Sequence, residues 1–144
     1  MFKIKFENLV FKSNKQKIYN NNIIILFYGI GCRSDDFKFL FNTLDPAFNL
    51  YIVELPGHNG IKYSGNDLYS FSKKIYLFLK KKNIKKISFF AHSIGGIIPI
   101  ILVRNFIKKK ILINNFINYE GNLTKYDTET LTKKTVSYEK NDFI

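Results

Sequence analysis

Hydrophobic and polar residues alternate at the start of the chain, and further on they separate into apolar blocks. Residues 2–11 alternate with a period of two, which predicts a half-buried strand. After a short polar turn, residues 15–19 are expected to return as a second strand. Residues 23–28 and 50–55 are almost entirely apolar, which is typical of strands covered on both faces of a parallel sheet.

Apolar residues at helical spacing follow each of these two apolar blocks. A first helix is expected over residues 34–44, because Ser34 and the two aspartates after it suit a helix start and Pro46 ends it. A second helix opens at Asn66 and Asp67 and closes at the lysines of residues 80–82, whose charge suits a helix C-terminus. Its predicted core face consists of Leu68, Phe71, Ile75 and Phe78.

The second half of the chain continues this alternation of strand and helix. Strands are predicted at residues 87–91 and 111–119, with a helix over residues 95–106 between them. Strands that alternate with helices indicate an α/β fold with a mainly parallel sheet and right-handed crossovers. From Gly121 onward the chain becomes polar, so we expect a core over residues 1–122 and a loosely ordered tail over residues 123–144.

Composition and charge narrow the range of partners. The chain has 144 residues with a formal net charge of +12, but its only arginines are Arg33 and Arg104. Since arginine is the preferred bidentate reader of phosphates and guanines, we expect no nucleic-acid partner. Residues 87–103 lack charge but contain two glycines and Pro99, so no membrane span is expected. Cys32 is the sole cysteine and no secretory signal is visible, which favours a cytoplasmic location.

Residues 91–96, with the sequence Ala-His-Ser-Ile-Gly-Gly, lie between a predicted strand and a predicted helix. This pattern is typical of a nucleophile elbow, in which a sharp strand-to-helix turn presents a serine hydroxyl. The small residues Ala91 and Gly95 flank Ser93 because larger side chains would collide within so tight a turn. The segment therefore predicts Ser93 as a nucleophile, against the alternative of a serine that merely permits the turn.

Three segments in order give the chain a resemblance to the α/β-hydrolase superfamily. Residues 27–31 (Phe-Tyr-Gly-Ile-Gly) resemble its oxyanion loop, residues 54–60 (Glu-Leu-Pro-Gly-His-Asn-Gly) its acidic-x-Pro-Gly-His-Gly loop, and residues 91–96 its elbow. The resemblance covers about residues 2–122, the N-terminal half of that fold. It implies a three-layer α/β-hydrolase-like architecture with a sheet of about six strands, truncated before the last strands.

The resemblance also implies roles for individual residues. Ser93 would attack an ester, thioester or related acyl bond of a small substrate, and the backbone N–H groups of Ile30 and Ile94 would form the oxyanion hole. Tyr28, where many members carry histidine, would lie with Gly29 and His58 at the cleft and its loops. No metal or cofactor is implied.

A general base for Ser93 is not apparent in the sequence. His58 and His92 are its only histidines; His92 should point away under the elbow, and the family does not generally use a histidine at the position of His58. In the family the base follows the last strand, beyond the segments present here. Glu120 is a candidate for the acid, because some members place their acidic partner after the sixth strand; the alternative is a surface loop residue.

Two hypotheses of different class therefore stay open. The first is a serine hydrolase whose missing half comes from a longer product or from a complementing chain. The second is a non-catalytic truncated homologue that acts as a binding or interaction module. In either case the sheet edge after the sixth strand would be uncovered, which predicts self-association through that edge.

Overall fold

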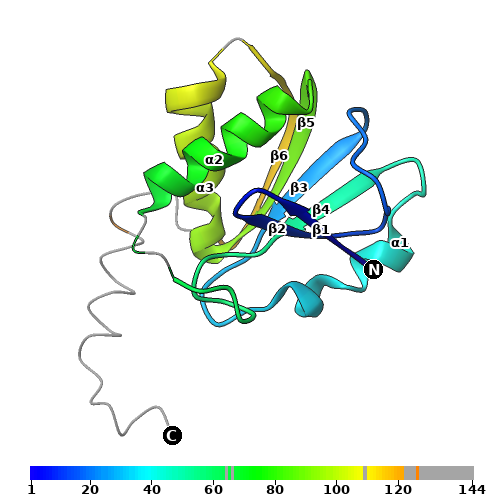
Figure 1. Ribbon diagram of the computed structural model, residues 1–144, viewed down its shortest axis with the longest axis horizontal. Helices are drawn as coiled ribbons and strands as arrows, with labels where there is room; N and C mark the ends of the chain where they lie inside the picture. The colour runs from blue at the N-terminus through cyan, green and yellow to red at the C-terminus, as the bar shows by residue number, and fades with distance from the viewer. Residues whose placement is uncertain (64, 66, 109, 122–125, 127–144) are drawn as a thin grey trace, which may run out of the picture.

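A computed structural model shows how the chain folds (Figure 1), and it describes residues 1–63, 65, 67–108, 110–121 and 126. The strands are β1 (Phe2–Phe6), β2 (Leu9–Ser13), β3 (Ile23–Phe27), β4 (Asn49–Val53), β5 (Lys86–His92) and β6 (Leu112–Tyr119). The helical segments are η1 (Ser34–Phe37), α1 (Leu40–Thr43), α2 (Leu68–Lys81), η2 (Ser93–Gly96), α3 (Ile97–Ile101) and η3 (Leu102–Ile107).

The strands form one six-stranded sheet in the order β1-β2-β4-β3-β5-β6. The β1–β2 and β2–β4 pairs are antiparallel, whereas β3 pairs in parallel with β4 and β5, and β5 in parallel with β6. The carboxyl ends of β3, β4, β5 and β6 therefore meet at one edge of the sheet, which is where open α/β sheets bind ligands. The fold is the mainly parallel α/β architecture that the sequence predicts.

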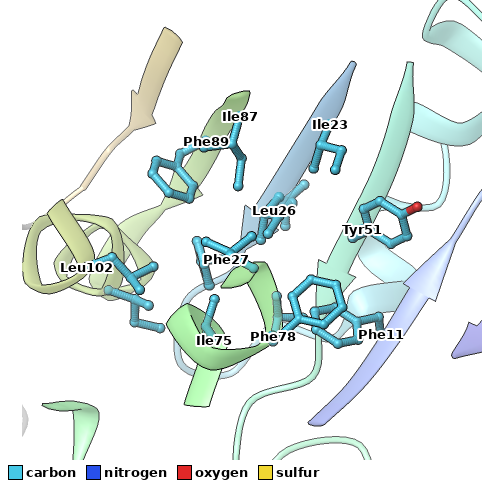
Figure 2. Close-up of a cluster of buried hydrophobic side chains, with 14 of the residues drawn as sticks. Phe11, Ile23, Leu26, Phe27, Tyr51, Ile75, Phe78, Ile87, Phe89 and Leu102 are labelled. Carbon is cyan, nitrogen blue, oxygen red and sulfur yellow. The ribbon is translucent and has the colours of Figure 1, made fainter. Parts of the chain in front are cut away.

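Helices cover both faces of this sheet. Figure 1 shows α2 and α3 side by side on one face, with α1 on the other. Figure 2 shows the core between the sheet and the face that α2 and α3 cover. There, Ile75 and Phe78 of α2 and Leu102 of η3 point toward Phe27 and Phe11. All five side chains are fully buried, so this apolar layer holds α2 and the helix after the elbow against the strands.

The predicted strands of the parallel sheet and the long helix are confirmed. β3, β5 and β6 lie within one residue of the predicted bounds, and β4 lies within two. α2 begins after Asp67, whose side chain accepts a hydrogen bond from the Ser70 amide, and it buries three of the predicted core positions, with Leu68 exposed. Asn66, which was expected to open the helix, lies outside the described residues.

The prediction of one strand over residues 2–11 is wrong. The chain folds there into a β1–β2 hairpin, with Glu7 at a φ of 51° in the turn. No glycine or proline marks this turn, and the alternating pattern is broken there only by the polar pair Glu7 and Asn8. The return strand expected at residues 15–19 does not form either, because β2 itself supplies the strand that pairs with both β1 and β4.

Two predicted helices are shorter or less regular than expected. Residues 34–44 form the 3-10 turn η1 and the one-turn helix α1 rather than one helix. Residues 93–107 begin as the 3-10 turn η2, continue as α3 and end as the π-helical η3. Pro99 lies within α3 and has no N–H to donate, so a regular ladder of α-helical bonds cannot run through this segment.

The loosely ordered tail expected over residues 123–144 lies outside the described residues except for Tyr126. The division of the chain near residue 122 therefore stays a prediction. Within the part of the chain that the structure describes, no helix is both long enough and apolar enough to cross a membrane.

Candidate active site

Ser93 lies at the turn between β5 and η2. β5 ends at His92 in extended conformation, and Ser93 follows with a φ of 54°, in the left-handed region that residues with side chains rarely adopt. The turn places Ser93 at the carboxyl edge of the parallel sheet, and its side chain is half-buried. The strand-turn-helix geometry expected of a nucleophile elbow is thus present, while the nucleophilic role itself stays a prediction.

Two glycines allow the elbow to pack tightly. A Cβ added to Gly95 would lie 2.5 Å from the carbonyl oxygen of Phe27 and 2.7 Å from that of Tyr28. A Cβ added to Gly29 would lie 2.7 Å from the Ser93 Cβ and 3.2 Å from its Oγ. The sequence pattern predicts crowding within the turn itself as the reason for Gly95, whereas the close neighbour in the structure is the backbone at the end of β3.

The two residues expected to form an oxyanion hole lie close to Ser93. Ile94 is the second residue of η2, within the first helical turn, where backbone N–H groups have no acceptor in the helix. Ile30 follows Gly29 in the loop after β3, and its side chain is 73% exposed. Because Gly29 contacts Ser93, this loop lies directly against the elbow. Whether the two amides act on a substrate oxygen stays a prediction.

An apolar cavity of about 180 Å³ opens beside the elbow. Ile30 and Ile94 both line it, so the two expected oxyanion-hole residues face one hollow. The loop after β4 contributes His58 to its wall, and α2 contributes Phe71. Its remaining lining residues are Leu55, Pro56, Tyr63, Asp67, Leu68 and Ile98. The sequence did not reveal this cavity, because its walls come from segments far apart in the chain.

Glu54, which directly follows β4, is a buried carboxylate with an exposed fraction of 3%. Its oxygens accept hydrogen bonds from the Tyr28 hydroxyl at 2.8 Å, the Ser34 hydroxyl at 2.5 Å and the Asn59 amide at 2.7 Å. The Tyr28 hydroxyl in turn accepts from the Leu55 amide at 3.0 Å. These bonds tie the loop after β3 to the loop after β4.

Tyr28 was expected at the cleft, and the structure places it below the loop, fully buried. Burial raises the pKa of its hydroxyl well above the ordinary value, with a smaller contribution from the hydrogen bond to Glu54. The Tyr28 hydroxyl is therefore neutral, and its two hydrogen bonds link the loop after β3 to the start of the loop after β4. Asn59 and Ser34 were missed as members of this network, although Asn59 stands where the hydrolase pattern has glycine and adopts a φ of 48°.

Neither histidine is hydrogen-bonded to Ser93 in the described part of the chain. The ring of His92 stacks on Tyr119, with centroids 5.7 Å apart, and its Nδ1 lies 3.7 Å from the Sγ of Cys32. His58 places Nδ1 3.2 Å from the carbonyl oxygen of Pro56 and lines the cavity.

Glu120 directly follows β6 and is exposed, with a φ of 49°. Because β6 is the neighbour of β5, Glu120 lies at the same edge of the sheet as Ser93, one strand away. Asn118, near the end of β6, is a polar residue that no sequence motif marks. Its Oδ1 is buried and has no hydrogen-bond partner among the described residues. Nor do three His, Cys, Asp or Glu side chains of these residues come together as a metal site.

Solved structures define the class of this protein. An α/β hydrolase from the metagenome of lagoon sediments at Mar Chica, Morocco, matches with a TM-score of 0.61 and 14% identity, over 94% of this chain and 58% of that one. A structure from a study of carboxylesterases of Nitrososphaera gargenis matches with a TM-score of 0.65 and 19% identity, over 93% of this chain and 50% of that one. A protein from Streptococcus mutans matches with a TM-score of 0.71 and 13% identity, over 93% of this chain and 51% of that one. The fold is that of the α/β hydrolases, and the chain spans about half the length of these proteins.

A family comparison gives a narrower assignment. The chain belongs to the family described as "Putative serine esterase (DUF676)", which matches residues 52–132. The matched segment includes the loop after β4, α2 and the elbow, so it contains most of the residues that line the apolar cavity. No curated protein matches the chain.

Proposed function

We propose that this chain carries the nucleophile-bearing half of a serine hydrolase that cleaves an ester or thioester of a small acyl group. One observation carries the proposal: Ser93 has a positive φ at the strand-to-helix turn and lies against Gly29, beside a cavity that Ile30 and Ile94 both line. Membership in a serine esterase family supports the same chemistry.

In the proposed reaction the Ser93 oxygen adds to the carbonyl carbon of the substrate, and a base takes the hydroxyl proton. The negative charge that develops on the carbonyl oxygen is stabilised by the N–H groups of Ile94 and Ile30. Collapse of this intermediate expels the alcohol or thiol, which receives the proton, and leaves an acyl ester on Ser93. Water then attacks the acyl ester and releases the carboxylic acid.

The cavity beside the elbow supports a small acyl group. Its volume is about 180 Å³, and its walls include Ile30, Ile94 and Phe71. An apolar cavity of about 150 Å³ is large enough for one benzene ring. A short acyl chain or a single ring fits this space.

The base is proposed to come from outside the described residues. The Nδ1 of His92 lies against Cys32, and that of His58 lies against the carbonyl of Pro56. In subtilisin, loss of the histidine alone lowers kcat by about 10⁶-fold, so we expect the isolated chain to turn over very slowly. A further segment or a complementing chain packed along β6 would supply the base.

The second candidate function is a non-catalytic binding module built on the same fold. The absence of a histidine hydrogen-bonded to Ser93 among the described residues favours it. Such a protein would still bind a small apolar ligand in the cavity beside Ile94. It would form no covalent intermediate.

Labelling with a fluorophosphonate probe separates these functions, because Ser93 would displace fluoride from phosphorus and gain a mass detectable by mass spectrometry. We expect slow labelling of the isolated chain at Ser93, abolished in Ser93→Ala and unchanged in the control Ser70→Ala. Labelling as fast as that of a complete serine hydrolase would contradict the need for an external base. No labelling after prolonged incubation would favour the binding module.

A further inference from the structure

A second hollow lies at the opposite edge of the sheet from Ser93. Its volume is about 330 Å³, and it is bordered by the C-terminal end of α2 and by the segments that precede β5 and β6. Figure 1 shows these three places together at the upper end of the sheet. Since parallel sheets bind ligands mainly at their carboxyl edge, a hollow at the amino edge is not part of the proposed hydrolase site.

Three lysines from three different segments line this hollow: Lys80 from α2, Lys85 before β5 and Lys110 before β6. None of its described lining residues is acidic. A lysine near a helix C-terminus is explained by the helix dipole, and this accounts for Lys80. It does not account for Lys85 or Lys110, which belong to no helix.

Backbone hydrogen bonds fix the segments that carry these lysines. The Leu112 amide donates to the Lys85 carbonyl at 2.8 Å, which holds the start of β6 beside the start of β5. The Lys110 amide donates to the Ile107 carbonyl at 2.9 Å, and the Asn83 amide donates to the Lys80 carbonyl at 3.0 Å. The three lysines therefore start from fixed backbone positions around one hollow, although each side chain is exposed.

The interior of the hollow is less polar than its rim. Ile84 and Ile111 are both buried and line it, together with the half-buried ring of Tyr76. A ligand that fits has a compact multivalent anion for the lysines and a small apolar part for the floor. Lysine binds phosphate as a point charge, and the volume lies at the lower end of the range for small-molecule sites, about 300–1,000 Å³.

We infer that this hollow binds a small organic phosphate, with Lys80, Lys85 and Lys110 around the phosphate and the apolar part against Ile84 and Ile111. A nucleic acid would require a basic stripe along the surface rather than three lysines around one hollow. The site is independent of the proposed hydrolase reaction, and its test needs no catalysis.

The test measures binding of phenyl phosphate and inorganic phosphate to the full chain by isothermal titration calorimetry. It is done at about 150 mM salt, where the Debye length is about 8 Å and distant surface charges are screened. One variant replaces the three lysines of the hollow with serine. A control variant removes the same charge from exposed positions elsewhere, at Lys5, Lys17 and Lys73. Circular dichroism verifies that both variants are folded.

We expect phenyl phosphate to bind the unmodified chain and the control with similar Kd values, more tightly than inorganic phosphate. Replacing the three lysines of the hollow with serine should raise the Kd for phenyl phosphate by about tenfold or more, which corresponds to about 1.4 kcal/mol. Equal weakening in both variants, no binding at millimolar phenyl phosphate, or equal affinity for the two phosphates would each overturn the inference. Binding of a DNA duplex that is lost when the three lysines of the hollow are replaced, and kept in the control, would also overturn the inference.

Discussion

Gly29 and Ser93, far apart in the sequence, approach so closely that a Cβ on Gly29 would lie 2.7 Å from the Cβ of Ser93. A separation this short is not compatible with two unshifted side chains. The loop after β3 and the elbow after β5 therefore form one unit, in which glycine is needed for contact and not for a positive φ. The position of Ile30 relative to Ser93 depends on this contact.

Gly29→Ala should separate the loop from the elbow. The added methyl group forces the loop or Ser93 to move, and a misplacement of about 1 Å in a catalytic group can cost about 100-fold in rate. We expect fluorophosphonate labelling of Ser93 to slow by about 10- to 100-fold. Gly31→Ala is the control, because a Cβ there meets no atom within 4 Å although its φ of +81° is strained. Equal slowing in both variants would mean that the Gly29–Ser93 contact is not the cause.

Gly95→Ala should lower the free energy of unfolding. Its new Cβ would meet backbone oxygens of Phe27 and Tyr28, which cannot rotate away as a side chain can. Overpacking of this kind costs about 1–3 kcal/mol of unfolding free energy. Urea denaturation measures the loss, with Ser93→Ala as a control in the same turn that should change stability by less than about 0.5 kcal/mol. An unchanged denaturation midpoint for Gly95→Ala would contradict the close packing of η2 on β3.

Tyr28→Phe should weaken the link between the loops after β3 and β4. The change removes the hydroxyl that donates to Glu54 and accepts from the Leu55 amide, and it leaves both partners buried. An unsatisfied buried polar group costs about 1–3 kcal/mol, so the free energy of unfolding should fall by about that amount. Tyr69→Phe, at a ring that is 49% exposed, is the matched control and should have no effect. A loss of the same size in both variants would be evidence against the network.

The sequence was sufficient to predict the parallel strands and the elbow, because local patterns define both. Apolar runs such as residues 23–28 mark buried strands, and a serine between small residues marks the turn at residues 91–96. A turn without glycine or proline leaves a weaker mark. The hairpin turn at Glu7, which adopts a positive φ, was missed for this reason.

Features built from distant segments could not be predicted from these patterns. Glu54 was noted only as part of a motif, and its bonds to Tyr28 and Ser34 depend on how two loops meet. The apolar cavity likewise combines α2 with both loops and the elbow. His92 was expected under the elbow, but its stacking on Tyr119 depends on the pairing of β5 with β6.

Ile117→Lys tests the self-association expected of β6. As the last strand of the described sheet, β6 leaves one row of backbone groups unpaired, and an exposed edge of this kind pairs readily with another chain. Its apolar side chains are also exposed, with Leu112 at 60%, Ile117 at 56% and Phe116 at 41%. We therefore expect copies of the chain to associate through this edge as concentration rises, and a lysine at position 117 to oppose this by charge repulsion. Sedimentation velocity over a concentration series measures the effect, with Leu77→Lys on α2 as the matched control, since Leu77 is 44% exposed. A chain that stays monomeric throughout the series, or that dissociates equally in both variants, would show that β6 is not the surface of association.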